Sequence, residues 1–495
     1  METTLKRDTV VSMELVWSGS GGRETSGEFV VPDTMPDVGE ILDTEGIVTV
    51  RGKETGAGYV QLGAGLVASV LYVPAEGGAP RSLEFPLPAD VRFDAPKADT
   101  DCRTVAQLRL RSMEARAVNS RKISVRAELE GEARCYRLIT TELTTDIESG
   151  DVGVHTLTGS SEVLIMSDVG EKSFVVTDEY GLPPECGSPD AIIAKRITPI
   201  IEDVKFVSGK AVFRGRILSE LVFSLGEGGI SAARYETEFS QIMEIGDESG
   251  EGLPEVTLLM TAAYYDLPEY GGEASRISAE LHYVAQCECR QRRELRYIRD
   301  AYSNRTELVP QWEEMTLTKE LSRLSQRQTV SGLAEPAVVG GELIRASGSA
   351  AGIALDHGVL KATVNIRMVF RMQDGRYTVS RCRMQAEFTL QNEEGSSLDR
   401  TEIAVTDIYC SAGAEVRASI QLNAMVQSIQ QIRCVSSVTA DEEAWAERER
   451  TPSMVLIRVP EGTELWDIAR RYHSTLEAID AVNGGRRDGL LLIPK

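Results

Sequence analysis

The most reactive side chains in this 495-residue chain belong to its eight cysteines and four histidines. Cys287-Glu288-Cys289 places two thiols two positions apart, a spacing that could hold a metal ion or form a redox pair. The same cysteines continue an alternating series with Leu281, Tyr283 and Ala285, which is the pattern of one face of a β-strand. We therefore expect both cysteines to be buried in a core, and we expect the eight scattered cysteines to be reduced thiols.

Two glycine-containing segments could in principle bind phosphate. Gly63-Ala64-Gly65-Leu66-Val67-Ala68 fits the dinucleotide pattern G-x-G-x-x-A, but it runs into an alternating strand and opens no helix whose N-terminus could receive the phosphate. Ser208-Gly209-Lys210-Ala211 lacks the upstream glycine and the Ser or Thr of a phosphate loop. No H-E-x-x-H or G-x-S-x-G motif occurs. The sequence predicts a protein that is not an enzyme and that needs neither a cofactor nor a metal.

Charge restricts the classes of partner. The formal net charge is −23 and the sequence pI is about 4.8, so both a nucleic-acid backbone and an anionic lipid surface would repel the chain. The N-terminal segment has no long apolar stretch after its basic residues, and no later segment is long and uncharged enough to cross a bilayer. We expect a cytoplasmic protein that is not an integral membrane protein and does not bind nucleic acid.

The last forty or so residues carry the clearest local pattern. A strand is expected from Met454 to Val459, and Pro460-Glu461-Gly462 ends it. Thr463 is expected to cap a first helix, and Ser474 with Glu477 has the spacing of a capping box for a second. The apolar positions of the first helix recur at helical spacing: Leu465, Ile468, Ala469 and Tyr472. Asn483-Gly484 ends the second helix, and a strand from Leu490 to Ile493 completes a βααβ order.

This segment resembles a LysM module, a family best known for binding peptidoglycan and chitin. The resemblance implies a ligand groove between the loop before the first helix and the loop after the second. Carried over by position, the groove residues are Gly462, Thr463, Leu465 and Asn483. The chain departs from the usual Gly-Asp-Thr-Leu, because Gly462 is followed by Thr463-Glu464-Leu465. Arg486 and Arg487 add positive charge beside the groove, which favours an acidic protein surface as its counterpart.

Tryptophan and tyrosine side chains in this module could stack on sugars. Trp466 and Tyr472 lie at helical spacing within a very small unit, so we predict that both contribute to its core.

The rest of the chain is organised by repetition. One alternating strand recurs about every 150 residues, at Leu66–Tyr72, Ala211–Phe223 and Lys361–Met372. A second follows it downstream at Ile123–Leu129, Ile277–Leu281 and Val416–Leu422. Alternation with period two indicates half-buried antiparallel sheets. We predict a mainly β chain with three tandem, sandwich-like domains at 1–145, 160–305 and 310–438, the third divergent. The polar segment Thr140–Ser161 is expected to separate the first two, and a charged linker at 439–452 precedes the α+β module at 453–495.

Short motifs in the repeats are similar to the SPOCS domains of endospore-forming bacteria. They are Phe29-Val30-Val31-Pro32-Asp33, Val118-Asn119-Ser120-Arg121-Lys122-Ile123, Val207-Ser208-Gly209-Lys210-Ala211-Val212-Phe213-Arg214-Gly215 and Ile298-Arg299-Asp300-Ala301-Tyr302-Ser303. Several such domains followed by a LysM module resemble the spore-coat encasement proteins, such as stage VI sporulation protein D and the clostridial protein that binds stage IV sporulation protein A.

That resemblance implies a non-catalytic scaffold on the mother-cell side of the forespore membrane. Its C-terminal module would attach the protein to the morphogenetic ATPase polymerised around the forespore, the stage IV sporulation protein A type. Peptidoglycan or its lipid-linked precursor is the other ligand that the LysM resemblance implies. Two hypotheses therefore stay open: a structural adaptor that binds a protein partner, and a glycan-binding protein that uses LysM for targeting in wall remodelling.

Overall fold

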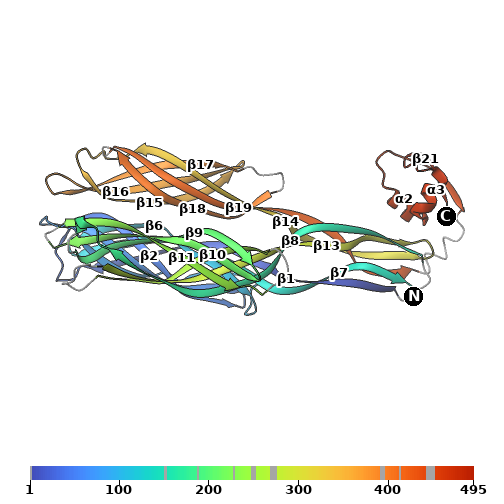
Figure 1. The fold of residues 1–495 in the computed structure, drawn as a ribbon, viewed down its shortest axis with the longest axis horizontal. Helices are drawn as coiled ribbons and strands as arrows, with labels where there is room; N and C mark the ends of the chain where they lie inside the picture. The colour runs from blue at the N-terminus through green and yellow to red at the C-terminus, as the bar shows by residue number, and fades with distance from the viewer. Residues whose placement is uncertain are drawn as a thin grey trace.

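The computed structural model describes residues 3–149, 153–186, 189–226, 229–246, 252–267, 276–390, 396–411, 414–441 and 452–494. Within these ranges the chain consists mainly of antiparallel β-strands, with two short α-helices near its C-terminal end. The predicted mainly β fold class is confirmed at this level. Figure 1 shows an elongated molecule in which packed sheets fill one half and long strands extend from them. The C-terminal elements lie near the far end of these strands, close to the N-terminus.

The first two sheets form a sandwich. One has the order β1–β7–β6 and contains β1 (Thr3–Val30), β6 (Arg103–Asn119) and β7 (Lys122–Ser149). The other has the order β2–β3–β4, with β5 also paired to β3, and contains β2 (Val38–Gly56), β3 (Tyr59–Pro74), β4 (Arg81–Pro88) and β5 (Val91–Asp94). Ile123 and Val125 of β7 share one buried apolar cluster with Leu66 and Val70 of β3, so the core lies between the sheets.

The same strand pairing recurs twice along the chain. The second set pairs β12 (Gly252–Asp266), β13 (Arg276–Ser303) and β8 (Val154–Gly181), and separately β11 (Gly229–Glu244), β10 (Lys210–Leu225) and β9 (Pro189–Val207). The third pairs β14 (Glu307–Leu333), β19 (Glu415–Asp441) and β18 (Ser396–Ser411), and separately β15 (Glu342–Asp356), β16 (Val359–Arg371) and β17 (Tyr377–Thr389). A short 3-10 turn, η1 (Pro184–Cys186), follows β8. We call the three sets the first, second and third units.

The strands that alternation predicts all form, and each occupies the middle of its own set. They are β3, β10 and β16 in one sheet of each unit, and β7, β13 and β19 in the other. A middle strand packs against a neighbour on both edges and against the core on one face, so its apolar side is continuous. In β16, Val364 and Met368 are fully buried, as expected for the inward face.

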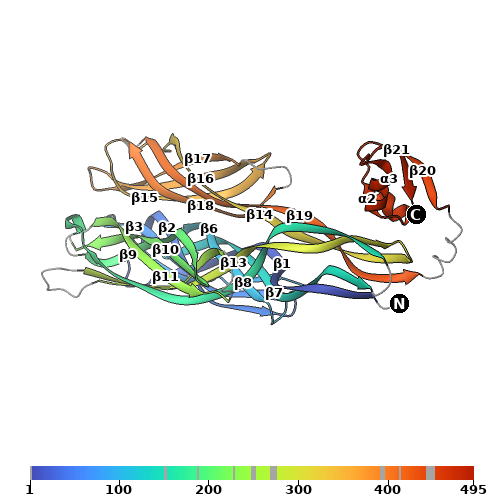
Figure 2. The ribbon, with the colours of Figure 1, turned by 45° about the vertical axis from the view of Figure 1, so that its right-hand side comes forward.

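Beyond the sandwiches, the outer parts of six strands form a second packed region, which we call the stem. It comprises residues 3–15 and 136–149 of the first unit, 154–168 and 289–303 of the second, and 307–321 and 426–441 of the third. Each unit contributes one antiparallel pair, β1 with β7, β8 with β13, and β14 with β19. The three pairs share a buried cluster containing Val10, Leu143, Val163, Ile165, Leu295, Tyr297, Ile432 and Cys434. Figure 2 shows this bundle extending from the sandwiches.

The stem corrects the predicted boundary between the first two domains. Residues Thr140–Ser149 and Val154–Ser161 were expected to be linker because they are rich in Thr, Asp, Glu and Gly, but they lie in β7 and β8. These strands face solvent on one side, so polar residues alternate with buried ones such as Leu143 and Ile147. Most of the predicted charged linker at 439–452 lies outside the described residues, and Thr439 to Asp441 belong to β19.

The C-terminal elements follow the expected strand, helix, helix, strand order. They are β20 (Met454–Val459), α2 (Leu465–Tyr472), α3 (Leu476–Asn483) and β21 (Gly489–Pro494), and we call them the module. Both predicted caps are wrong by one residue. Glu464 precedes α2 without a side-chain cap, and Thr475 caps α3 by accepting a hydrogen bond from the Ala478 amide. Ser474, the expected cap of α3, instead donates its hydroxyl hydrogen to the Pro494 carbonyl oxygen.

Candidate functional site

The antiparallel pairing of β20 with β21 determines where the predicted groove residues lie. Val459 pairs with Gly489, so the loop that follows β20 and the loop that precedes β21 meet at the same end of the module. Gly462 and Thr463 lie in the first loop, and Arg486 and Arg487 lie in the second. The structure therefore brings these four predicted residues to one end of the module.

The predicted groove residues differ in what their side chains do. Gly462 is exposed and has a φ of +84°, a conformation that favours glycine. The Thr463 hydroxyl donates to the Pro460 carbonyl oxygen, 2.9 Å away, and stabilises the turn instead of capping α2. Arg486 and Arg487 are exposed, and no ion pair of either guanidinium is found within the described residues. These two arginines remain available for a ligand.

Two other predicted groove residues are used by the module itself. Leu465 is half-buried against the module core. The Asn483 side chain donates to the carbonyl oxygens of Ile479 and Leu492, both at 2.7 Å, and accepts from the Leu492 amide at 2.8 Å. Asn483 therefore joins the end of α3 to β21, and its amide is already committed to structural hydrogen bonds.

The module packs against the tip of the stem through α2. Asp300, near the end of β13, is 8% exposed. Its Oδ2 atom accepts a hydrogen bond from the indole Nε1 of Trp466 at 2.9 Å and one from Nη1 of Arg470 at 2.8 Å. Its Oδ1 atom accepts from the Ala301 amide at 3.0 Å. A buried carboxylate with three donors holds one helix of the module against the second unit.

An aromatic contact continues this interface. The Tyr302 ring meets Trp466 edge to face, with centroids 4.9 Å apart, and stacks on His155 at 5.1 Å. Burial raises the pKa of Tyr302 to about 12, so its hydroxyl stays protonated and donates to the Ser474 carbonyl oxygen at 2.8 Å. Trp466 is buried, as predicted, but part of its burial comes from the stem.

His473 extends the contact to the third unit. Its Nδ1 atom lies 2.8 Å from the Ser303 carbonyl oxygen, and its Nε2 atom lies 3.2 Å from Oε2 of Glu307, the first residue of β14. In the sequence, Asp300, Tyr302 and Ser303 appear only as part of a repeat motif. Their packing role was missed because no local pattern connects them with α2, some 165 residues later.

A second group of polar residues lies where the three units meet. Glu288 of β13 is 1% exposed and accepts hydrogen bonds from the Tyr136 hydroxyl of the first unit and the Arg400 guanidinium of the third. Arg134 of the first unit contacts it at 3.7 Å. Burial alone would raise the pKa of Glu288, but Arg400 and Arg134 outweigh it and hold that pKa below its usual range. One carboxylate therefore joins all three units.

This part of the structure corrects the sequence interpretation of β13. Cys287 and Cys289 are each 1% exposed and belong to the core of the second unit, as predicted. In a half-buried sheet the opposite face would be exposed to solvent, but Gln286 and Glu288 are also 1% exposed because the first unit covers them. The strand is therefore buried on both faces at this point.

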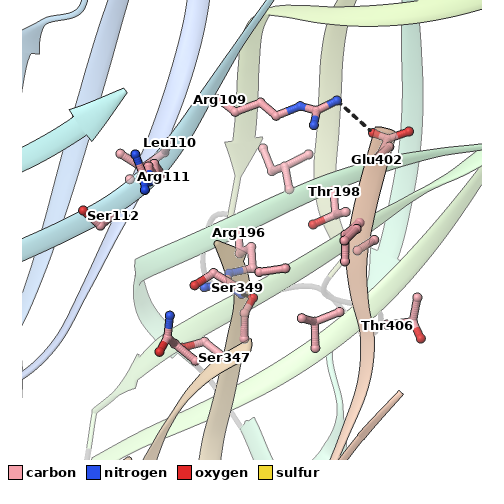
Figure 3. Close-up of a pocket in the computed structure, with 18 of the residues that line it drawn as sticks. Arg109, Leu110, Arg111, Ser112, Arg196, Thr198, Ser347, Ser349, Glu402 and Thr406 are labelled. Carbon is pink, nitrogen blue, oxygen red and sulfur yellow. Dashed lines mark hydrogen bonds and ion pairs between the residues drawn. The ribbon is translucent and has the colours of Figure 1, made fainter. Parts of the chain in front are cut away.

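A cavity of about 1800 Å³ lies between the units. Edge strands from all three contribute to its walls, and Figure 3 shows Arg109 of β6 reaching Glu402 of β18, 3.6 Å away. A buried ion-pair cluster lines another part of the wall. Arg345 lies 3.2 Å from Asp43 and 3.1 Å from Glu45, and Arg196 lies 2.7 Å from Glu45. Because these residues come from β15, β2 and β9, the cluster also links three units.

The described ranges contain no group of three or more His, Cys, Asp or Glu side chains placed to hold a metal ion. No helix within those ranges is long and apolar enough to cross a membrane. No protein-family model matches the chain, and no curated protein or solved structure matches it either. The polar residues described above can perform two tasks: they join the three units to each other, and they fix the module on the stem with Arg486 and Arg487 exposed.

Proposed function

We propose that this chain is a non-catalytic structural adaptor of spore-coat assembly or encasement. In this proposal the three units correspond to SPOCS-type domains and the module to a LysM-like module. The module attaches the protein, in the mother-cell cytoplasm, to a morphogenetic ATPase of the stage IV sporulation protein A type at the forespore surface. The SPOCS and LysM motifs of the sequence support this assignment.

The way in which the module is held on the stem is the main structural support for this proposal. The module is fixed to the stem through Trp466, Arg470 and His473, all on or just after α2, whereas both groove loops stay exposed. A module tethered only by a flexible linker would lose orientational freedom on binding, whereas a fixed module has already lost it. The sandwiches of the units lie toward the other end of the elongated molecule, so they remain free for a different layer.

The arginines on the second loop indicate the chemistry of the partner surface. Arg486 and Arg487 lie on a chain of net charge −23, so they form a local exception to its acidic surface. Guanidinium groups pair with carboxylates in a planar, two-point geometry, which suits an acidic protein surface. The sugar rings of a glycan are uncharged and would gain little from the two positive charges.

Localisation in a spore-forming host tests this proposal. Arg486→Glu with Arg487→Glu reverses the loop charge without touching the module core, so the folded protein should no longer collect at the forespore surface. The matched control is Arg292→Glu with Arg293→Glu, an adjacent pair on the stem. Normal localisation of the folded loop variant would overturn the role of this loop, and normal localisation of a chain lacking residues 452–495 would overturn targeting by the module.

A further inference from the structure

The module has an apolar face that the helices do not cover. Met454, Leu456 and Leu490 on the outer side of the β20–β21 sheet are 55%, 59% and 62% exposed. The register places Arg458 opposite Leu490 and Leu456 opposite Leu492, so these side chains share one surface. The other side of the sheet supplies the buried core through Ile457, Val459, Leu491 and Ile493. We call the outer surface the sheet face.

Exposed apolar side chains are concentrated in this module. Within the described residues, 22 large hydrophobic side chains are exposed, and five of them lie in the module: Met454, Leu456, Leu476, Val482 and Leu490. The module spans fewer than a tenth of the residues, so this share is more than twice that expected from its length. Three of the five lie together on the sheet face, and Leu476 and Val482 lie on α3. A cluster of exposed aliphatic side chains marks an interaction site, whereas single exposed side chains do not.

Charge indicates what covers the sheet face. Of its six outward positions, 454, 456, 458, 490, 492 and 494, none is acidic, and one is Arg458. Aliphatic side chains beside an arginine, with no carboxylate among the outward positions, fit the boundary between acyl chains and anionic headgroups of a bilayer. We propose that the sheet face is a peripheral docking surface for a membrane that contains anionic phospholipid.

The acidic character of the whole chain does not prevent this contact. The module lies near the far end of the stem, away from most of the chain (Figures 1 and 2). Charges in solution are screened over about 8 Å at physiological ionic strength, so distant carboxylates exert little repulsion on a bilayer under the module. The proposal stands apart from the proposed adaptor function, because the protein partner uses the loops and the lipid uses the sheet face.

Vesicle flotation with the full-length chain tests the proposal. We expect the protein to float with phosphatidylcholine vesicles that contain phosphatidylglycerol and to float far less with pure phosphatidylcholine vesicles. Arg458→Ala should lower the partition coefficient roughly fivefold at physiological ionic strength, the contribution of one arginine near an anionic surface. Leu456→Glu with Leu490→Glu should reduce flotation to the level of pure phosphatidylcholine. The control is Leu138→Glu on β7, where the leucine is 61% exposed.

Three outcomes would overturn the proposal: no flotation of the folded wild-type chain with anionic vesicles, unchanged flotation of the Leu456→Glu, Leu490→Glu variant, or equal loss in the Leu138→Glu control. Concentration-dependent self-association through the sheet face, or capture of a protein partner there without lipid, would also overturn it. Capture of the coat ATPase by Arg486 and Arg487 is measured without vesicles, so failure of one proposal is distinguishable from failure of the other.

Discussion

At the scale of single residues, Asp300 decides how the module is held. Its carboxylate is buried and accepts hydrogen bonds from Trp466, Arg470 and the Ala301 amide. A hydrogen bond to a charged group is stronger than one between neutral groups, and a buried donor left without an acceptor is costly. The orientation of the module on the stem therefore depends on this one side chain more than on any single apolar contact.

Asp300→Ala should loosen the module without unfolding the units. Trp466 and Arg470 would lose a charged acceptor, and we expect the module contact to weaken by about 1.5 to 3 kcal/mol for each hydrogen bond removed. Hydrogen exchange across α2 would measure the change as faster exchange. Asp467→Ala is the matched control, because Asp467 lies on the same helix and is exposed. Equal exchange in both variants would contradict the role of Asp300.

Trp466→Ala should have a larger effect, because Trp466 belongs to the module core as well as to the contact with Tyr302. Removing a buried aromatic side chain typically costs about 3 to 5 kcal/mol, enough to unfold a unit as small as the module. We expect loss of a cooperative transition for the module in urea unfolding of the full chain. A variant that retains the wild-type transition would show that the indole is dispensable for packing.

At the scale of elements, the strands show what sequence patterns can predict. The middle strands β3, β7, β10, β13, β16 and β19 were predicted because each has one continuous apolar face. The stem was not predicted, because the outer parts of β7 and β8 alternate polar with moderately apolar residues and resemble linkers. The residues that bury these outer parts belong to the other two units and lie far away in the sequence, so no local pattern reveals them.

In the module, too, local patterns reveal some features and only contacts across space determine others. Local spacing predicts its two helices and its two strands, because these depend on neighbours in sequence, whereas the groove between its two loops was an implication of the LysM resemblance. The commitment of Asn483 to β21 and the packing of α2 on Asp300 depend on contacts across space. Arg486 and Arg487 lie on an exposed loop, and Asn483, which the LysM resemblance places at the groove, uses its amide in hydrogen bonds that stabilise the fold.

The ionisation of Glu288, at the junction of the three units, should make the free energy of unfolding depend on pH. Because the pKa of Glu288 is lowered in the folded state, its ionised form contributes stability at pH values above the pKa of the unfolded chain. That contribution is lost as the pH falls through the lowered folded value, when the carboxylate is protonated. We expect the free energy of unfolding to be steady near neutral pH and to fall in acid.

Glu288→Gln should remove this part of the acid dependence and lower stability at neutral pH by roughly 3 to 5 kcal/mol, because the buried Arg400 guanidinium would lose its carboxylate partner, whereas Arg134 would keep its ion pair with Asp399. Urea unfolding from neutral to acidic pH measures both effects. Glu171→Gln is the control, since that carboxylate is exposed in its ion pair with Lys53. An unchanged acid slope in Glu288→Gln would exclude Glu288 as the titrating group.

At the scale of the whole molecule, three units joined by buried charges form one body with two ends. The cavity and both polar junctions lie among the sandwiches, and the module lies near the other end of the stem. Edge strands that line the cavity are covered by the neighbouring units, which protects them from pairing with other chains. This arrangement leaves the outer surfaces of the sandwiches, and the loops and the sheet face of the module, as the surfaces on which partners can act.

The most direct test of the adaptor proposal is the affinity of the full chain for a polymerised ATPase of the stage IV sporulation protein A type, with peptidoglycan as the competing ligand. We expect the wild-type chain to bind the polymer, Arg486→Glu with Arg487→Glu to weaken binding roughly tenfold or more, and Arg292→Glu with Arg293→Glu to leave it unchanged. Binding to peptidoglycan alone, or equal binding of the polymer by the folded loop variant and the wild type, would contradict the proposal.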